Sequence, residues 1–225
     1  MNQNKNHLLF FWVPLTILVL QFILEFTIQS YHLAQIHSEN GPHELLQFFI
    51  LVIALMVALL GAKKAHSQKN TPITLWFLLA AVCCTYVAGE EVSWGQHFVN
   101  WTTPEYWASL NDQGETNFHN TSSWLDQKPR LILEIGVIVG GLLIPLITRF
   151  KPSLLPSKFA IIYPTSNLAF TALIFLCLKV TDKADKFGLS PFERVSEVQE
   201  LYLFYFVLLY LLDLSKRISL KQTDA

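Results

Sequence analysis

The sequence predicts an all-α protein, a polytopic integral membrane helix bundle of about six transmembrane helices. Of the 225 residues, 52% are hydrophobic and only 15% are charged, and the mean hydropathy of +0.37 is above that of an ordinary soluble domain. Long apolar runs also recur along the chain, and several approach the roughly 20 residues that a helix needs to cross a hydrocarbon core. Because lipid offers no hydrogen-bond partners to the backbone, such runs are helices rather than strands.

The predicted spans follow one another as a single membrane domain over residues 1–225, and the third and sixth are expected to continue as helix beyond their apolar runs. The runs are Leu8–Leu24, Leu45–Gly61, Ile73–Ala88, Leu131–Ile147, Phe159–Leu178 and Leu201–Leu214. Lys5 is the only Lys or Arg before the first run, and no small-residue cleavage site follows the run. We therefore expect a retained helix and not a signal peptide. In the fourth run, Gly136 and Gly140 form a GxxxG pattern, which predicts close helix packing.

The distribution of basic residues predicts the orientation of the bundle. Loops on the side of the chain ends hold ten of the 16 basic residues and two acids, whereas most carboxylates lie at the opposite ends of the helices. The ten are Lys5, Lys63, Lys64, Lys69, Arg149, Lys151, Lys158, Lys216, Arg217 and Lys221. Lys and Arg mark the cytoplasmic side, so both termini should be cytoplasmic and residues 89–130 extracytoplasmic. The net charge of −1 argues against nucleic acid as a partner.

A polar, aromatic-rich segment after the third span is the clearest candidate for a functional site. It reads GEEVSWGQHFVNWTTPEYWASLNDQGETNFHN over Gly89–Asn120 and contains three of the six tryptophans. If the helix continues past its apolar run, Glu90, Ser93 and His97 share one face, unless Gly95 ends the helix first. A carboxylate and an imidazole two turns apart can ligate one metal or act as an acid–base pair. Alternatively, the charged end of the span simply lies among the lipid headgroups.

Further carboxylates and a second histidine complete the candidate set. Glu115 and His119 stand four residues apart and would meet on one face of a helix. Glu44 lies in the first turn of the second span, where the helix dipole offers an alternative reason for an acid. Glu197 and Glu200 share a face at the start of the sixth span. The predicted catalytic residues are Glu90 and Ser93, and the predicted metal ligands are Glu44, Glu91, His97, Glu115, His119, Glu197 and Glu200.

Two strings in this segment also resemble a known sequence pattern. GEEVSWGQ (Gly89–Gln96) and QGETNFHN (Gln113–Asn120), with Thr103 and Pro104 between them, resemble an uncharacterised family of small multi-span bacterial membrane proteins. The resemblance implies a bacterial inner-membrane protein. It supplies no reaction.

The leading functional hypothesis is a membrane-embedded, metal-dependent enzyme that acts on a lipid or another membrane-dissolved substrate at the extracytoplasmic face. The presence of imidazole favours Fe, Mn or Zn over Ca, and the number of carboxylates favours a dinuclear centre. The reaction stays open between oxidation and metal-assisted hydrolysis or transfer. Two alternatives are a proton-coupled or cation-binding transport protein and a non-enzymatic membrane assembly protein. The sequence shows no internal repeat, which argues against transport.

Overall fold

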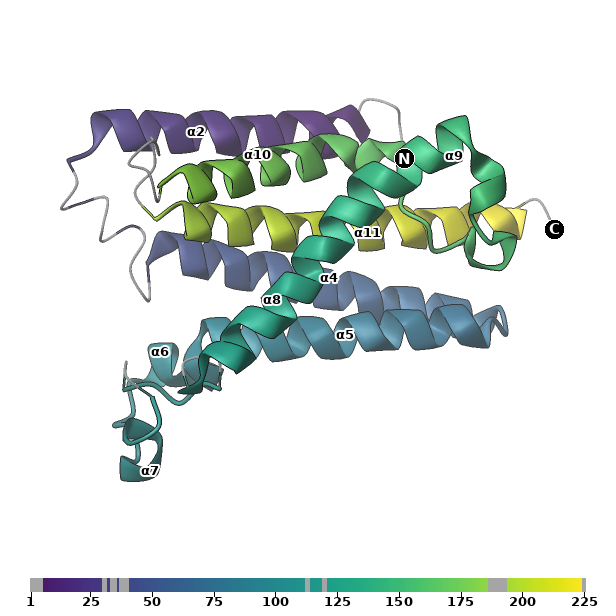
Figure 1. Ribbon diagram of the computed structural model, residues 1–225. Helices are drawn as coiled ribbons and strands as arrows, with labels where there is room; N and C mark the ends of the chain where they lie inside the picture. The colour runs from purple at the N-terminus through teal and green to yellow at the C-terminus, as the bar shows by residue number, and fades with distance from the viewer. Residues whose placement is uncertain are drawn as a thin grey trace. The chain divides into compact units, whose positions relative to one another are not determined.

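The computed structural model describes residues 6–29, 32, 36, 41–111, 114–118, 121–185 and 194–223 (Figure 1). This part of the chain is helical and contains no strand. It holds five helices that are long and apolar enough to cross a membrane: Leu8–Thr27, Pro42–Ser67, Thr71–Glu91, Gln127–Phe150 and Val195–Leu220. The predicted fold class, a polytopic helical bundle, is therefore confirmed.

The chain forms two compact units. Unit 1 combines Met1–Ser38 with Gly136–Ala225, and unit 2 is Glu39–Ile135. The boundary between them falls inside helix α8 (Ser123–Ile138).

Unit 2 is built on a helical hairpin of α4 (Pro42–Ser67) and α5 (Thr71–Glu91), which lie side by side in Figure 1. Both helices begin with a proline in the first turn, where the missing N–H costs no hydrogen bond. The side chain of Asn70 caps α5 by accepting a hydrogen bond from Ile73 N at 3.4 Å. Gly61 allows the two helices to approach closely, because a Cβ there would lie 2.5 Å from the fully buried ring of Phe77.

The third predicted helix continues past its apolar run, as expected, but only as far as Glu91 and not to His97. After Glu91 the chain makes one 3₁₀ turn, η2 (Ser93–Gly95), and then a single helical turn, α6 (Gln96–Val99). Glu90, Ser93 and His97 therefore do not share a helical face, and that part of the prediction is wrong. The break precedes Gly95, at Ser93, whose side chain bonds to the distant residue Glu115. The short helix α7 (Glu105–Ala108) follows Pro104.

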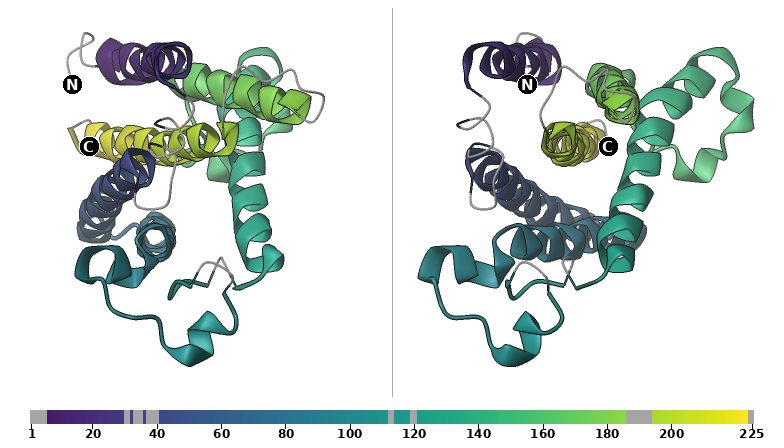
Figure 2. Two further views of the ribbon diagram at one scale, coloured as in Figure 1. Left: turned by 90° about the vertical axis from the view of Figure 1, so that its left-hand side faces the viewer. Right: turned by 60° about the vertical axis from the view of Figure 1, so that its left-hand side comes forward.

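The long helices of unit 1 include α2 (Val13–Thr27), α10 (Ala169–Asp185) and α11 (Val195–Thr223), which Figure 2 shows from two further sides. The π-helical turn η1 (Leu8–Trp12) leads into α2, and Pro14 lacks the N–H that would continue the π-helical pattern to the carbonyl of Leu9. The hydroxyl of Tyr205 on α11 donates to that carbonyl at 2.8 Å. Burial of α11 against this turn thus satisfies a backbone group that proline leaves without a partner.

Two sequence predictions for unit 1 need adjustment. Close packing occurs at Gly140 and Gly141 in η4 (Val139–Leu143), where a Cβ would lie 3.1 Å from Pro164 and 2.4 Å from Ala172, respectively. Gly136, the other member of the predicted pair, has nothing within 4 Å. The predicted span Phe159–Leu178 is helical only from Ala169, in α10. Before α10 the chain forms helix α9 (Ile144–Phe150) and the 3₁₀ turns η5 (Pro152–Leu154), η6 (Ser157–Phe159) and η7 (Ser166–Leu168). The prolines in this stretch prevent a continuous helix.

Candidate functional site

A buried cluster of hydrogen-bonded side chains joins the end of α5 to residues 114–118. The hydroxyl of Ser93 donates to Glu115 Oε2 at 2.5 Å, and His97 Nε2 lies 2.7 Å from Glu115 Oε1. The amide of Asn117 donates to Glu115 Oε2 at 2.6 Å and to Ser93 Oγ at 3.0 Å. Ser93 and Asn117 are fully buried and Glu115 is 8% exposed. These contacts bring together three of the predicted site residues, Ser93, His97 and Glu115.

The backbone at this point is strained. Ser93 and Trp94 have φ angles of 46° and 55°, in the left-handed region that residues with a Cβ rarely adopt, and Gly95 follows at 103°. Strain of this kind costs of the order of 1–3 kcal/mol per residue and persists where surrounding contacts enforce it. The contacts of Ser93 with Glu115 and Asn117 are of that kind, because they hold its hydroxyl toward the 114–118 segment.

The spacing of Glu115 and His119 predicted a pair on one helical face. Gly114–Phe118 is not helical, so these residues do not form the helix on which that prediction rested. His119 itself lies outside the described residues. The imidazole that pairs with Glu115 is His97, 18 positions earlier in the chain.

Gln96, which was not among the predicted site residues, holds the 114–118 segment in place. Its Oε1 accepts hydrogen bonds from the backbone N of Thr116 at 2.8 Å and from the Thr116 hydroxyl at 2.9 Å. Its Nε2 donates to Thr103 Oγ1 at 2.8 Å, and the Thr103 hydroxyl donates in turn to the carbonyl of Gly114. A search for charged residues misses a neutral amide. The available signal was the position of Gln96 and Thr116 within the two strings that carry the family resemblance.

Glu90, predicted to be catalytic, holds the aromatic side of the site. It is 4% exposed. Its Oε1 accepts a hydrogen bond from the indole N–H of Trp94 at 2.6 Å, and its Oε2 accepts one from the backbone N of Phe118 at 2.7 Å. Both carboxylate oxygens thus fix residues that line a cavity.

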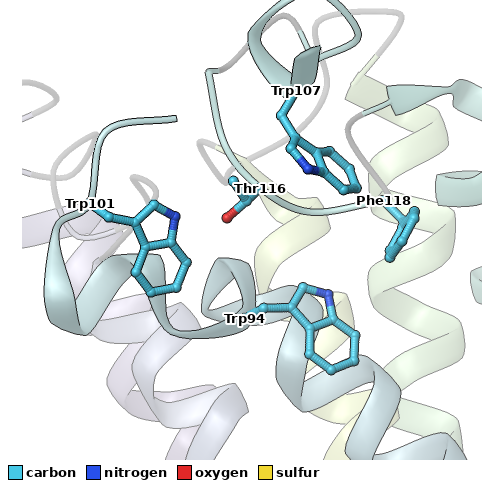
Figure 3. A pocket seen from close by; sticks show the side chains of 5 residues that line it. All are labelled: Trp94, Trp101, Trp107, Thr116 and Phe118. Carbon is cyan, nitrogen blue, oxygen red and sulfur yellow. The ribbon is translucent and has the colours of Figure 1, made fainter. Parts of the chain in front are cut away.

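That cavity has a volume of about 370 Å³ and is lined by Trp94, Trp101, Trp107, Thr116 and Phe118. Figure 3 shows the four aromatic side chains placed around Thr116. The rings of Trp107 and Phe118 meet edge to face, with centroids 5.1 Å apart. Trp94 is 45% exposed and Trp101 is 38% exposed, so ring surface is available to a ligand. Ser93 and Glu115 are the chain neighbours of Trp94 and Thr116, which places the cavity beside the Glu115 cluster.

The other described predicted ligands belong to both units. Glu44, in the first turn of α4, and Glu91, the last residue of α5, are half-buried in unit 2. Glu197 and Glu200 are half-buried on α11 in unit 1. Among the residues that the structure describes, no three or more His, Cys, Asp or Glu side chains form a group that could hold a metal ion. The predicted seven-residue ligand set is divided between the two units, and its member His119 is not described.

Fold and site together define a helical protein of the membrane-spanning type, with a hydrogen-bonded carboxylate–imidazole pair and an aromatic cavity at the end of one candidate span. No protein-family model, no curated protein and no solved structure matches the chain.

Proposed function

We propose that the protein is a membrane-embedded enzyme that acts on a lipid or another membrane-dissolved substrate, with His97 and Glu115 as its acid–base pair. The observation that supports this proposal best is the Ser93–Glu115–His97 cluster, buried beside a cavity of ligand size. A carboxylate and an imidazole in contact at a buried position are typical of proton-transfer sites.

The geometry suggests a role for each member. Glu115 faces His97 Nε2, so it orients the ring and stabilises the imidazolium that forms when the ring takes up a proton. Nδ1 is then the nitrogen that exchanges a proton with the substrate. Ser93 donates to the carboxylate and not to the imidazole, so its position favours orienting Glu115 over acting as a nucleophile. Asn117 donates to the same carboxylate oxygen and supports that orientation.

The location of the pair favours a substrate dissolved in the membrane. The cluster follows directly on α5, one of the candidate spans, and the tryptophans around it are typical of a membrane–water interface. The excess of Lys and Arg in the loops on the side of the chain ends supports cytoplasmic termini and an extracytoplasmic site. Together with the family resemblance, this orientation supports the proposal that the protein belongs to a bacterial inner membrane.

We retain the prediction that the enzyme depends on a metal, because His97 and Glu115 could also act as metal ligands. His97 Nε2 and Glu115 Oε1 supply one nitrogen and one oxygen ligand of the type that Fe, Mn and Zn accept, and His119 is the candidate third ligand. Elemental analysis of purified wild-type and His97→Ala protein distinguishes the two roles. Stoichiometric metal that disappears in the variant assigns the pair as ligands. Conversion that persists after chelation assigns them as acid and base.

The enzymatic proposal is tested by lipid analysis of cells. Total lipid extracts of the native host, of a deletion strain and of strains complemented with variants are compared by mass spectrometry. We expect wild-type protein to restore a lipid profile that the deletion changes, and His97→Ala or Glu115→Gln to reduce that conversion by at least about 100-fold, the usual contribution of a general acid or base. His66→Ala and Glu105→Gln, which alter exposed residues of the same types, serve as controls.

Variant amounts in the membrane are matched before the comparison. A deletion strain with an unchanged lipid profile, or full complementation by His97→Ala, would refute the proposal.

A further inference from the structure

We propose that the cavity between Trp94, Trp101, Trp107 and Phe118 binds a quaternary ammonium group. A cation over the face of an aromatic ring, within about 6 Å of its centroid, is attracted by the ring quadrupole, and tryptophan gives the strongest attraction. Three of the five residues that line this cavity are tryptophans, and a fourth is phenylalanine. A volume of about 370 Å³ suits a small head group.

The charges of this part of the chain favour a cation over an anion. No Lys or Arg occurs between Lys69 and Lys128, a stretch that includes every residue of the cavity. Glu90 bonds to two of the residues that line the cavity, through the indole N–H of Trp94 and the backbone N of Phe118. An indole that donates to a carboxylate gains electron density, which strengthens the attraction of its face for a cation.

The lining also selects among cations. A primary ammonium carries three N–H donors and loses stability when it leaves water without finding acceptors. Among the described residues of the lining, the one side-chain oxygen is the Thr116 hydroxyl, which donates to Gln96 Oε1 at 2.9 Å. Its lone pairs can accept from a ligand, but this single oxygen does not supply an acceptor for each of the three N–H groups of a primary ammonium. A quaternary ammonium has no N–H group to satisfy, so its methyl groups can contact the rings without that cost.

The aromatic residues are held in place before a ligand arrives. Trp94 packs on Gly89, where a Cβ would lie 2.9 Å from its ring, and its indole N–H is bonded to Glu90. Phe118 is fixed by its backbone bond to Glu90 and by edge-to-face contact with Trp107. Binding therefore orders few side chains, which favours affinity. That this cation is part of the substrate held beside His97 rests on the proposed function, whereas its binding does not.

The test is a titration of the full-length protein in dodecyl maltoside, followed by tryptophan fluorescence and calorimetry. The probes are tetramethylammonium, choline and the neutral choline isostere 3,3-dimethyl-1-butanol. We expect saturable binding of both cations, with the neutral isostere at least about tenfold weaker. Trp101→Leu and Trp107→Leu should each weaken cation binding by at least about tenfold, with partial recovery in Trp101→Phe. Trp124→Leu, at a 64% exposed tryptophan outside the cavity, should bind as wild type.

A second arm identifies the source of the group. Protein in nanodiscs of phosphatidylcholine, compared with phosphatidylglycerol, should show reduced choline binding if a lipid head group occupies the cavity, and equal binding if the ligand is a free solute. Equal affinity for choline and its neutral isostere, or no saturable binding of either cation, would overturn the inference. His97→Ala protein should bind the cations as wild type does. Cation binding therefore tests the cavity independently of lipid conversion. If wild-type protein binds the cations but converts no lipid, the enzymatic proposal fails and the cation site stands.

Discussion

Replacing Glu115 by Gln tests whether the buried cluster stabilises the protein as its geometry implies. The carboxylate takes part in three hydrogen bonds, with Ser93, Asn117 and His97, at 2.5 to 2.7 Å. A hydrogen bond to a charged group contributes about 1.5–3 kcal/mol and a neutral one about 0.5–1.5 kcal/mol. The substitution therefore costs about 1 kcal/mol per bond, or about 3 kcal/mol in all. For a chain of this length, that lowers Tm by roughly 6–12 °C.

The assay is thermal unfolding of purified protein in detergent, followed by circular dichroism. Glu105→Gln is the matched control, because Glu105 is an exposed carboxylate in the same part of the chain, and its replacement should change stability by less than about 0.5 kcal/mol. A double-mutant cycle with Ser93→Ala should give a coupling energy of at least about 0.5 kcal/mol, as expected for residues in contact. A Tm for Glu115→Gln within about 2 °C of wild type, or additive effects of the two substitutions, would refute this account of the cluster.

Two further predictions follow from the packing and from the charge distribution. Gly89→Ala should displace the indole of Trp94, because the new Cβ would lie 2.9 Å from the ring, and should weaken tetramethylammonium binding by at least about tenfold. Gly136→Ala, at a glycine with nothing within 4 Å, is the control, and unchanged binding in Gly89→Ala would contradict the prediction. For topology, a cysteine at Ser123 in a background without native cysteines should react with an impermeant thiol reagent in intact cells, whereas one at Lys64 should not. The reverse pattern would invert the predicted orientation.

The fold could be predicted from the sequence because span length and hydropathy are local properties. Each of the five candidate spans contains or overlaps one of the predicted apolar runs. The exception is Phe159–Leu178, where apolar composition continues through Pro164 although a regular helix does not. Hydropathy reports the environment of the side chains, whereas a proline interrupts the backbone, so composition alone places the start of α10 too early.

The site could be predicted only as a set of residues, and not as a set of contacts. We expected Glu90 and His97, and likewise Glu115 and His119, to lie on one face of a regular helix. Sequence spacing predicts which side chains share a face only where the helix is continuous. The contacts of Ser93 and His97 with the 114–118 segment join residues 18 to 24 positions apart, and the chain leaves helical geometry at Ser93 to make them. Such tertiary hydrogen bonds override local propensity, and nothing in the local sequence reports them.

The polar side chains of the site fall into two groups. Some accept hydrogen bonds from backbone N–H groups, and others bond to side chains. A non-helical segment beside a membrane span has N–H and C=O groups that need partners. Glu90 and Gln96 serve that need, because each accepts a hydrogen bond from a backbone N of the 114–118 segment. Within the described part of the chain, the carboxylate of Glu115 forms its hydrogen bonds with the side chains of Ser93, His97 and Asn117. Satisfying the backbone therefore accounts for Glu90 and Gln96. It does not account for the pairing of the Glu115 carboxylate with the His97 imidazole, and that pair is where we expect the chemistry.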